Sequence, residues 1–408
     1  MNLELAQFEL PFFTNLLILL VTARLFGELF ERFKQPAMIG EIVAGIVLGP
    51  SVLNLVHRTH DIEVISELGV FMLVIIAGLE INIDEILKSF KGKNIFISFS
   101  AFFIPVLSGI WLGVVFKQDL MTTAFISLCV AITALPVSIR ILMDLGKLNT
   151  EVGQKIISVA IFDDVLALSI LGVLLNLKNT DLSFGAVAEV ASISILKLLL
   201  FIAILSASYF VLQKITNKGN YVELYLDKIL SVIRGKESLF ALFFIFILLF
   251  STITETLGFH FIIGAFFAAM LISEKVVGSV HLKTVEKTTS SLAMGFLAPI
   301  FFAGIGLEFN FSAIQNYSLL AGILAVSYFS KILGGLFGGY LAGLENRISL
   351  ILGIGLNARG IMELVIVNIA FKAGYINAEI FSILIVMGVL TTLTTPIMLK
   401  WSFNRFKI

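Results

Sequence analysis

Two adjacent carboxylates lie near the middle of the stretch Ile157-Ser158-Val159-Ala160-Ile161-Phe162-Asp163-Asp164-Val165-Leu166-Ala167-Leu168. The apolar segment around them runs from about Gln154 to Leu177, which is long enough to cross a bilayer. Carboxylates at that depth are costly unless they are paired, protonated or bound to a cation, so such acids usually mark a functional site. The alternative is structural: both acids face a polar interior and hold helices together. The stretch predicts a membrane helix with an acid pair at its centre.

The composition is that of an integral membrane protein. Of 408 residues, 58% are hydrophobic and 14% are charged, with a mean hydropathy of +1.04, whereas a soluble domain has roughly 25% charged residues. The single Cys129 lies in an apolar segment, which excludes a disulfide framework or a cysteine metal site. A formal net charge of zero and scattered Lys and Arg residues argue against a nucleic-acid partner. The acidic N-terminus, with Glu4 and Glu9, predicts a mature first helix and not a signal peptide.

Apolar windows of about 20 residues predict about thirteen transmembrane spans and an all-α fold. The expected spans are 11–33, 37–54, 64–83, 94–116, 120–143, 151–177, 188–213, 238–257, 260–274, 290–308, 317–344, 348–373 and 378–400. The spans 37–54 and 260–274 are short, and several others are interrupted by Gly, Pro or polar residues.

Basic residues predict the orientation. With the N-terminus outside, the inner loops contain twenty of them: Arg32, Lys34, Lys88, Lys91, Lys93, Arg140, Lys147, Lys155, Lys214, Lys218, Lys228, Arg234, Lys236, Lys275, Lys283, Lys287, Arg347, Lys400, Arg405 and Lys407. The outer loops contain four: Arg58, Lys117, Lys178 and Lys372. This bias follows the positive-inside rule and predicts an outer N-terminus and an inner C-terminus.

An internal repeat is visible in the chain. Gly78-Leu79-Glu80-Ile81-Asn82-Ile83 ends the third span, and Gly306-Leu307-Glu308-Phe309-Asn310-Phe311 ends the tenth. The preceding short spans correspond as well, with Ile39-Gly40-Glu41-Ile42-Val43-Ala44-Gly45 beside Ile263-Gly264-Ala265-Phe266-Phe267-Ala268-Ala269. An offset of seven spans gives the two copies opposite orientations. Inverted repeats are typical of transporters whose substrate site lies at broken helices near the membrane centre.

Two spans contain signals of such breaks. Ala131-Ile132-Thr133-Ala134-Leu135-Pro136-Val137-Ser138 places a proline in the middle of the fifth span, where it removes a backbone hydrogen bond. Seven spans later, Gly353-Ile354-Gly355-Leu356-Asn357-Ala358-Arg359-Gly360 places glycines, Asn357 and Arg359 at the equivalent position. Two crossing breaks bring helix ends together, and we expect Arg359 and Glu363 to compensate their dipoles. The alternative is a pair of ordinary Pro and Gly kinks.

The acid pair suggests ion exchange. Asp163 and Asp164 point about 100° apart around a helix, so both can face one cavity, though not identically. An ionised carboxylate with freed carbonyls from residues 131–136 would provide oxygen ligands for a monovalent cation. Burial and a like-charged neighbour favour the protonated form of a carboxylate, so one site could hold either a cation or protons. Lys331 lies in the middle of its span, where we expect it to pair with one aspartate and to release a proton when the cation arrives.

These motifs resemble the monovalent cation:proton antiporter family 2. The segment Gln35-Pro36-Ala37-Met38-Ile39-Gly40-Glu41-Ile42-Val43-Ala44-Gly45-Ile46-Val47-Leu48-Gly49-Pro50 is similar to the family's second-helix signature. Ala77-Gly78-Leu79-Glu80, Thr133-Ala134-Leu135-Pro136 and Phe162-Asp163-Asp164 follow in the family's order. The family includes NapA-type sodium/proton antiporters, KefC-type potassium efflux systems and plant cation/proton exchangers. Gly360-Ile361-Met362-Glu363-Leu364-Val365-Ile366-Val367-Asn368 resembles the plant proteins most.

The resemblance implies a NhaA/NapA-like fold of thirteen helices, with a dimerisation domain and a core domain that moves the ion like an elevator. It implies one membrane unit over 1–408, with core portions 64–177 and 290–373. The portions 1–63, 188–289 and 374–408 would be mainly dimerisation domain and connecting helices. The chain ends at Ile408, so we expect no C-terminal regulatory domain of the KefC type.

By the same resemblance, Asp164 is the ion- and proton-binding carboxylate, and Asp163 is the partner of Lys331. Thr133 and Pro136 would belong to the first unwound segment, and Arg359, Glu363 and Asn357 to the second. Glu363 stands four residues after the arginine, where the bacterial antiporters have an acid after two. An Asp-Asp pair with a lysine is similar to the electrogenic members, in which two protons exchange for one cation.

The sequence therefore predicts a secondary Na⁺ (or K⁺)/H⁺ antiporter of the cell membrane, without a cofactor, acting as a homodimer. A K⁺/H⁺ exchanger or a K⁺ efflux subunit is the alternative in the same class. An organic-anion symporter and a transporter-like sensor are alternatives from other classes. An enzyme is disfavoured because the outer-loop pair His57 and His60 has no further ligands nearby in the sequence. The choice between Na⁺, Li⁺ and K⁺ stays open, because all three use such oxygen sites.

Overall fold

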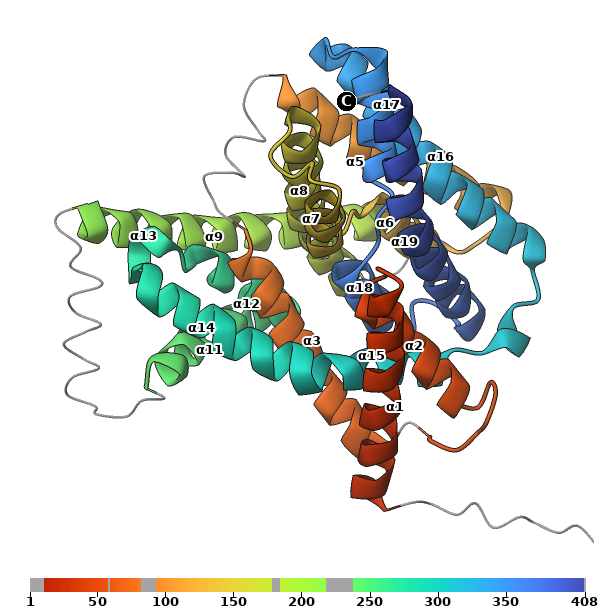
Figure 1. Cartoon of the computed structure of the whole chain (residues 1–408). Coiled ribbons are helices and arrows are strands. Elements are labelled where there is room, and N and C mark those ends of the chain that lie inside the picture. Colours follow the sequence, from red (N-terminus) through yellow and green to blue (C-terminus); the bar gives the residue numbers. More distant parts are fainter. Residues whose placement is uncertain (1–10, 58, 82–92, 178–183, 218–237, 407–408) are drawn as a thin grey trace, which may run out of the picture. The chain divides into compact units, whose positions relative to one another are not determined.

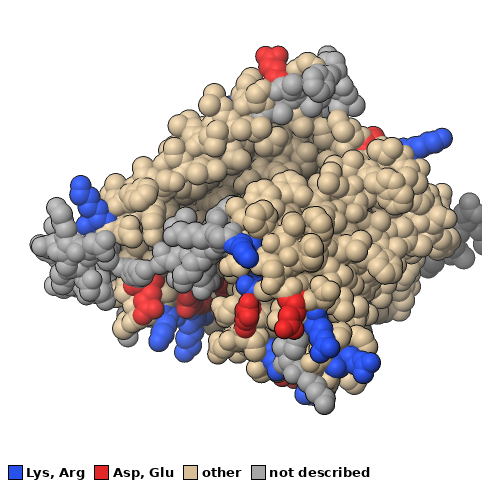
Figure 2. Space-filling view, turned by 90° about the horizontal axis from the view of Figure 1, so that it is seen from above, with Lys and Arg blue, Asp and Glu red and all other residues tan. Residues whose placement is uncertain are grey.

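The computed structural model describes residues 11–57, 59–81, 93–177, 184–217 and 238–406 (Figure 1). These residues form helices joined by short connections, and no strand occurs among them. Within the described part, ten helices are long and apolar enough to cross a membrane. Large apolar side chains such as Leu107, Leu196 and Phe329 are exposed on their surfaces. In the view of Figure 2, residues other than Lys, Arg, Asp and Glu cover most of the surface. The chain is a multi-pass membrane protein.

The ten long helices match predicted spans. They are α1 (Phe12–Arg32), α3 (His60–Leu79), α5 (Asn94–Val115), the pair α6 (Leu120–Ala131) and α7 (Leu135–Asp144), α8 (Glu151–Asn176), the segment Ser192–Lys214 of α9 (Phe184–Asn217), α11 (Ser238–Thr256), the run of α14 (Ser279–Leu292), η1 (Ala293–Leu297) and α15 (Ala298–Glu308), α16 (Tyr317–Ala342) and α19 (Ala378–Phe406). The spans predicted at 37–54, 260–274 and 348–373 contain shorter helices. These are α2 (Ala37–Leu48), α12 (Phe261–Leu271), α17 (Asn346–Gly355) and α18 (Ile361–Lys372).

The segment before the tenth span differs from the prediction. We expected a loop there with Lys275, Lys283 and Lys287, but the chain forms a short helix α13 (Glu274–Val277) and then α14, which continues through a π-helical turn into α15. A hydropathy window stops at charged residues, whereas helical hydrogen bonding continues through them. Nine of the basic residues used to predict the orientation lie outside the described residues: Arg58, Lys88, Lys91, Lys178, Lys218, Lys228, Arg234, Lys236 and Lys407. Asn82 and Ile83 of the repeat lie outside them as well.

The structure contains two compact units, of which the first comprises Met1–Met72 and Ser291–Gln315. Its described part packs α2 against α1 and α15. A methyl group at Gly45 would overlap the Ala303 carbonyl, and one at Gly306 would overlap the Ile42 carbonyl. The two backbones are therefore in direct contact, which only glycine permits.

The second unit comprises Leu73–Ser290 and Asn316–Ile408 and contains the acid pair. Helix α16 runs along α5 (Figure 1), and its Gly334 and Gly338 face the backbone of that helix. Helix α8 contacts α5, α6, α7 and α17. Helix α8, which contains the two aspartates, is thus packed against these four helices of this unit. The division into core and dimerisation portions, at 64–177, 290–373, 1–63, 188–289 and 374–408, stays a prediction.

Candidate functional site

The first helix break lies between α6 and α7. Helix α6 ends at Ala131, Ile132 and Ala134 are extended, and α7 begins at Leu135 with Pro136 in its first turn. A proline at this position loses no helical hydrogen bond, because the first N–H groups of a helix have no partner within the helix. The break is therefore shorter than the stretch 131–136 expected from the sequence. Thr133 lies in it and is fully buried.

The second break lies between α17 and α18. Helix α17 ends at Gly355, and α18 begins at Ile361, with an extended Gly360 before it. Asn357 and Arg359 lie in this break, and the Asn357 amide donates to the Gly353 carbonyl over 3.1 Å. Glu363 lies outside the unwound segment, in the first turn of α18. An acid there faces the positive end of the helix dipole.

The two breaks lie against each other and share their hydrogen-bonding groups. The Ala134 N–H donates to the Ala358 carbonyl over 2.9 Å, and the Thr133 hydroxyl donates to the Leu356 carbonyl over 3.0 Å. Backbone groups freed by one break are thus satisfied by the other, as buried polar groups require.

Arg359 connects the second break to the end of α6. Its Nη2 donates to the Val130 carbonyl over 2.6 Å, which places a cation at the negative end of the α6 dipole. The Thr392 hydroxyl of α19 donates to the Arg359 carbonyl over 2.9 Å and lies 3.2 Å from its N–H. Thr392 is not among the site residues predicted from the sequence, although the cluster Thr391-Thr392-Leu393-Thr394-Thr395 in an apolar helix is a usable signal.

The two aspartates of α8 have different surroundings. Both are fully buried. Lys331 Nζ lies 2.8 Å from Asp163 Oδ2 and also donates to the Ala101 carbonyl of α5 over 3.2 Å. Asp164 has no hydrogen-bond partner on either carboxylate oxygen, and neither has Asp163 on Oδ1, within the described structure. The charge of Asp163 is balanced by Lys331, whereas the Asp164 carboxylate has no such partner among the described residues.

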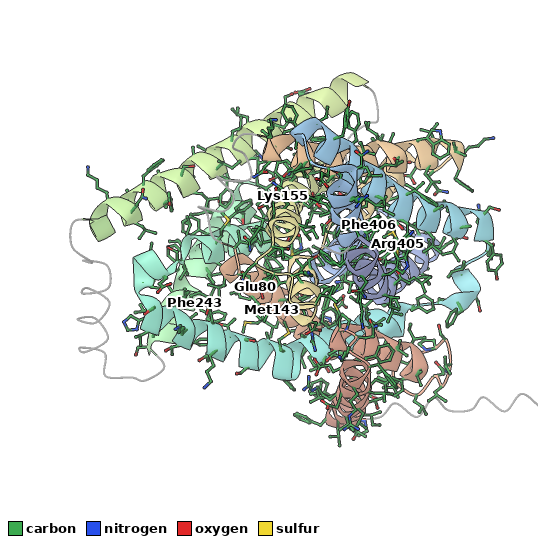
Figure 3. The ribbon with its side chains drawn as sticks, turned by 45° about the horizontal axis from the view of Figure 1, so that its top comes forward. Glu80, Met143, Lys155, Phe243, Arg405 and Phe406 are labelled. Atoms are coloured by element: carbon green, nitrogen blue, oxygen red, sulfur yellow. The ribbon has the colours of Figure 1, made fainter. Side chains whose placement is uncertain are left out.

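Glu80 also acts electrostatically on Asp164. It directly follows the last residue of α3 and is exposed (Figure 3). Lys155, labelled in the same view, lies near the start of α8, the helix that contains the two aspartates. The charges that act on Asp164 are those of Asp163, Glu80 and Lys331. A positive charge at Asp164 would therefore be favoured by Asp163 and Glu80 and opposed by Lys331. The unpaired oxygens of Asp164 and Asp163 suit the hard oxygen coordination that alkali cations use.

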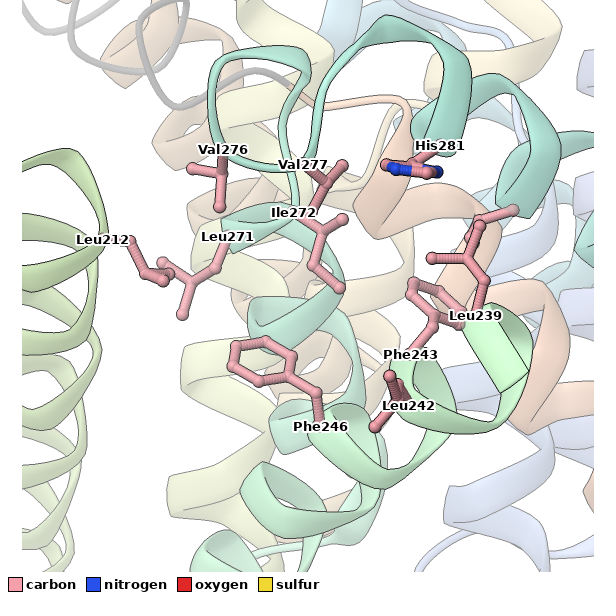
Figure 4. Close-up of a pocket in the computed structure, with 11 residues that line it drawn as sticks. Leu212, Leu239, Leu242, Phe243, Phe246, Leu271, Ile272, Val276, Val277 and His281 are labelled. Atoms are coloured by element: carbon pink, nitrogen blue, oxygen red, sulfur yellow. The ribbon is translucent and has the colours of Figure 1, made fainter. Parts of the chain in front are cut away.

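Other features of the chain lie apart from this group. His57 and His60 are exposed. An apolar cavity of about 260 Å³ in the second unit is lined by side chains from α9, α11, α12, α13 and α14, Leu212, Phe243, Leu271 and His281 among them (Figure 4). No carboxylate lines this cavity, so it is not part of the acid site.

A family model and two bacterial relatives, all named for sodium/proton exchange, match nearly the whole chain. The family model described as "Sodium/hydrogen exchanger, transmembrane" matches residues 16–405. The Na⁺/H⁺-K⁺ antiporter GerN of Bacillus cereus is 28% identical over 398 residues, covering 97% of each chain. The Na⁺/H⁺ antiporter NhaS4 of Synechocystis is 30% identical, covering 95% of this chain and 96% of its own.

Two further relatives extend the comparison. The cation/H⁺ antiporter 18 of Arabidopsis thaliana is 28% identical over 96% of this chain, which corresponds to 49% of the plant protein. Among solved structures, the sodium proton antiporter MjNhaP1 of Methanocaldococcus jannaschii superposes with a TM-score of 0.71 at 15% identity, covering 96% of both chains. This last likeness concerns the fold alone.

Proposed function

The chain belongs to the sodium/hydrogen exchanger family, and on this premise we propose that it is a secondary active antiporter that exchanges protons for a monovalent cation. The cation is Na⁺ or K⁺. The name of GerN, which includes both ions, supports K⁺ as a second candidate for this chain. The transported ions are substrates, and no cofactor takes part.

The observation that carries the proposal is the unpaired carboxylate of Asp164. It is fully buried, and neither oxygen has a hydrogen-bond partner in the described structure. An ionised carboxylate in such a place is strongly disfavoured unless a positive charge joins it. A proton and a cation both meet this need, but they cannot occupy the same oxygens together. Competition at one carboxylate couples the two fluxes in opposite directions.

The surrounding groups are proposed to support this exchange. Thr133, in the first break, interacts with Asp163, whereas Asn357 lies in the second break and Pro136 in the first turn of α7. Arg359 and Glu363 compensate helix dipoles, and Lys331 balances Asp163. With one aspartate balanced, a single positive charge at Asp164 suffices to neutralise the pair.

The resemblance to family 2 supports the larger frame of the proposal. The proposed thirteen spans are the ten long helices together with α2, α12 and the pair α17–α18, and we propose that they form two inverted repeats. We place the N-terminus on the outer side and the C-terminus on the inner side of the cell membrane. The core portions carry the site across the membrane in an elevator motion within a homodimer, and two protons exchange for one cation.

The test is cation-driven proton movement in proteoliposomes that contain a pH-sensitive dye. Na⁺, Li⁺ and K⁺ are added in turn to the wild type and to Asp164→Asn, with and without a clamped membrane potential. We expect dequenching with at least one cation, its loss in Asp164→Asn, and a dependence on voltage. The control is Asp144→Asn, at the exposed end of α7, which keeps the signal. Absence of dequenching with every cation, or full activity of Asp164→Asn, would contradict the proposal.

A further inference from the structure

A third buried carboxylate lies near the crossing of the breaks. Glu363, in the first turn of α18, is fully buried. Neither of its oxygens has a hydrogen-bond partner in the described structure. Polar side chains in this setting are normally paired, so an unpaired acid calls for an explanation.

The groups around Glu363 form no hydrogen bond with its carboxyl oxygens in the described structure. From α19, Gly388 faces it closely enough that a Cβ atom there would lie 3.5 Å from both carboxylate oxygens. From α6, the buried thiol of Cys129 interacts with it electrostatically. The charged group that acts on Glu363 is Arg359. Glycine and a thiol provide no charge that would hold the carboxylate in its ionised form.

Arg359 does not form an ion pair with Glu363. Its guanidinium group donates through Nη2 to the Val130 carbonyl, while Nε and Nη1 have no hydrogen-bond partner in the described residues. Arg359 nevertheless interacts electrostatically with both Glu363 and Asp163. Glu363 is therefore linked through Arg359 to the acid pair on α8 without being locked in a salt bridge.

Lys331 is the group that the sequence suggested as the source of a second proton, but its contacts favour the charged form. It donates to the Asp163 carboxylate and to the Ala101 carbonyl. Releasing its proton would break an ion pair between two fully buried side chains, whereas the Glu363 carboxyl group has no hydrogen bond to lose in the described structure. Glu363 is therefore the group whose protonation state can change without breaking an ion pair.

We propose that Glu363 is a second exchangeable proton site, so that one proton is bound by Asp164 and the other by Glu363. This inference rests on the proposed antiport and names its second proton carrier. In the proton-loaded form both groups are neutral, and Asp163, Lys331 and Arg359 give the core a net charge of +1. In the cation-loaded form both are ionised, and the cation brings the sum to zero. Exchange of the two protons for one cation therefore lowers the net charge of these groups by one.

The coupling ratio tests this proposal directly. In proteoliposomes, the membrane potential is clamped at zero by an ionophore for an ion that the protein does not carry, and a pH difference of one unit is set across the membrane. The cation concentration ratio at which net exchange stops, the null gradient, is then measured. For the wild type this null gradient is about a hundredfold, and for Glu363→Gln it is about tenfold, because one proton fewer is linked to each cation. The null gradient is an equilibrium quantity, so a variant with fewer active molecules gives the same value.

Glu41→Gln is the matched control. Glu41 is a buried glutamate of α2 in the first unit, 3.7 Å from Arg24, and its substitution leaves the null gradient unchanged. An unchanged null gradient in Glu363→Gln would overturn the proposal and assign the second proton to another group. If the wild type shows no exchange, the proposed function itself has failed.

A second measurement applies if Glu363→Gln exchanges ions too slowly for its null gradient to be determined. Protons released on addition of Na⁺, or of K⁺ if that is the transported ion, are counted with purified protein in weakly buffered detergent solution. We expect two protons per bound cation in the wild type and one in the variant. Release of the same number by both, or a folded variant that binds no cation, would overturn the proposal.

Discussion

At the scale of single residues, Asp163 and Asp164 show how two neighbours on one helix acquire different roles. Both are fully buried on α8, but only Asp163 reaches Lys331. Successive residues point about 100° apart, so one carboxylate faces α16 and α5 while the other stays free. Asp163 is therefore paired, and Asp164 is the acid that we propose for exchange.

The first prediction concerns the ion pair. Lys331→Met leaves Asp163 buried without a cation, and removing one partner of a buried pair destabilises a protein by about 3–5 kcal/mol. We expect a clear fall in the thermal unfolding temperature in detergent. The double variant Asp163→Leu with Lys331→Met, which removes both charges, should recover most of the loss. A single variant as stable as the wild type would show that the pair is not formed.

The acid pair and its lysine could be predicted from the sequence because charges are rare inside apolar spans. The choice of Asp163 as the partner came from the family resemblance and not from periodicity. Helix α8 is apolar around its whole circumference near the acids, so the 3.6-residue pattern does not show which side faces α16. The Ala101 and Val130 carbonyls, which are hydrogen-bond acceptors in the site, leave no signal in a sequence because every residue has one.

At the scale of secondary-structure elements, the crossing of two broken helices positions the site. Pro136 and the glycines around Asn357 predicted both breaks, although the first is shorter than expected. Their pairing through Ala134 and Ala358 brings α6, α7, α17 and α18 to one place. Helix α14 could not be predicted, because its charged residues resemble a loop in a hydropathy plot.

The second prediction concerns the hydroxyl that joins the two breaks. Thr133→Ala removes its hydrogen bond to the Leu356 carbonyl and leaves that buried oxygen without this donor. A net hydrogen bond contributes about 1 kcal/mol, which corresponds to roughly a fivefold lower kcat/KM for cation exchange. Thr133→Ser keeps the hydroxyl and should retain most of the activity. Equal kcat/KM values for the two variants would rule out this role.

At the scale of the whole molecule, the predicted orientation depends on the distribution of basic residues. Part of that distribution lies in segments outside the described residues, and the spans in the described part are consistent in length with a bilayer.

The third prediction tests the orientation with introduced cysteines. The native Cys129 is fully buried and should not react. Lys117→Cys and Arg347→Cys each place a thiol at an exposed helix end. In intact cells, a membrane-impermeant maleimide should label position 117 and should label position 347 only after permeabilisation. The reverse pattern would place the N-terminus inside.

The measurement that tests the central claim most directly is the apparent KM for the transported cation as a function of pH. If a proton and the cation compete for Asp164, the apparent KM rises as the pH falls, by about tenfold per pH unit where Asp164 alone releases a proton and by up to about a hundredfold where Glu363 releases one as well, while the maximal rate at saturating cation stays nearly constant. A KM that does not change with pH, with an effect on the maximal rate alone, would contradict competition at a single carboxylate.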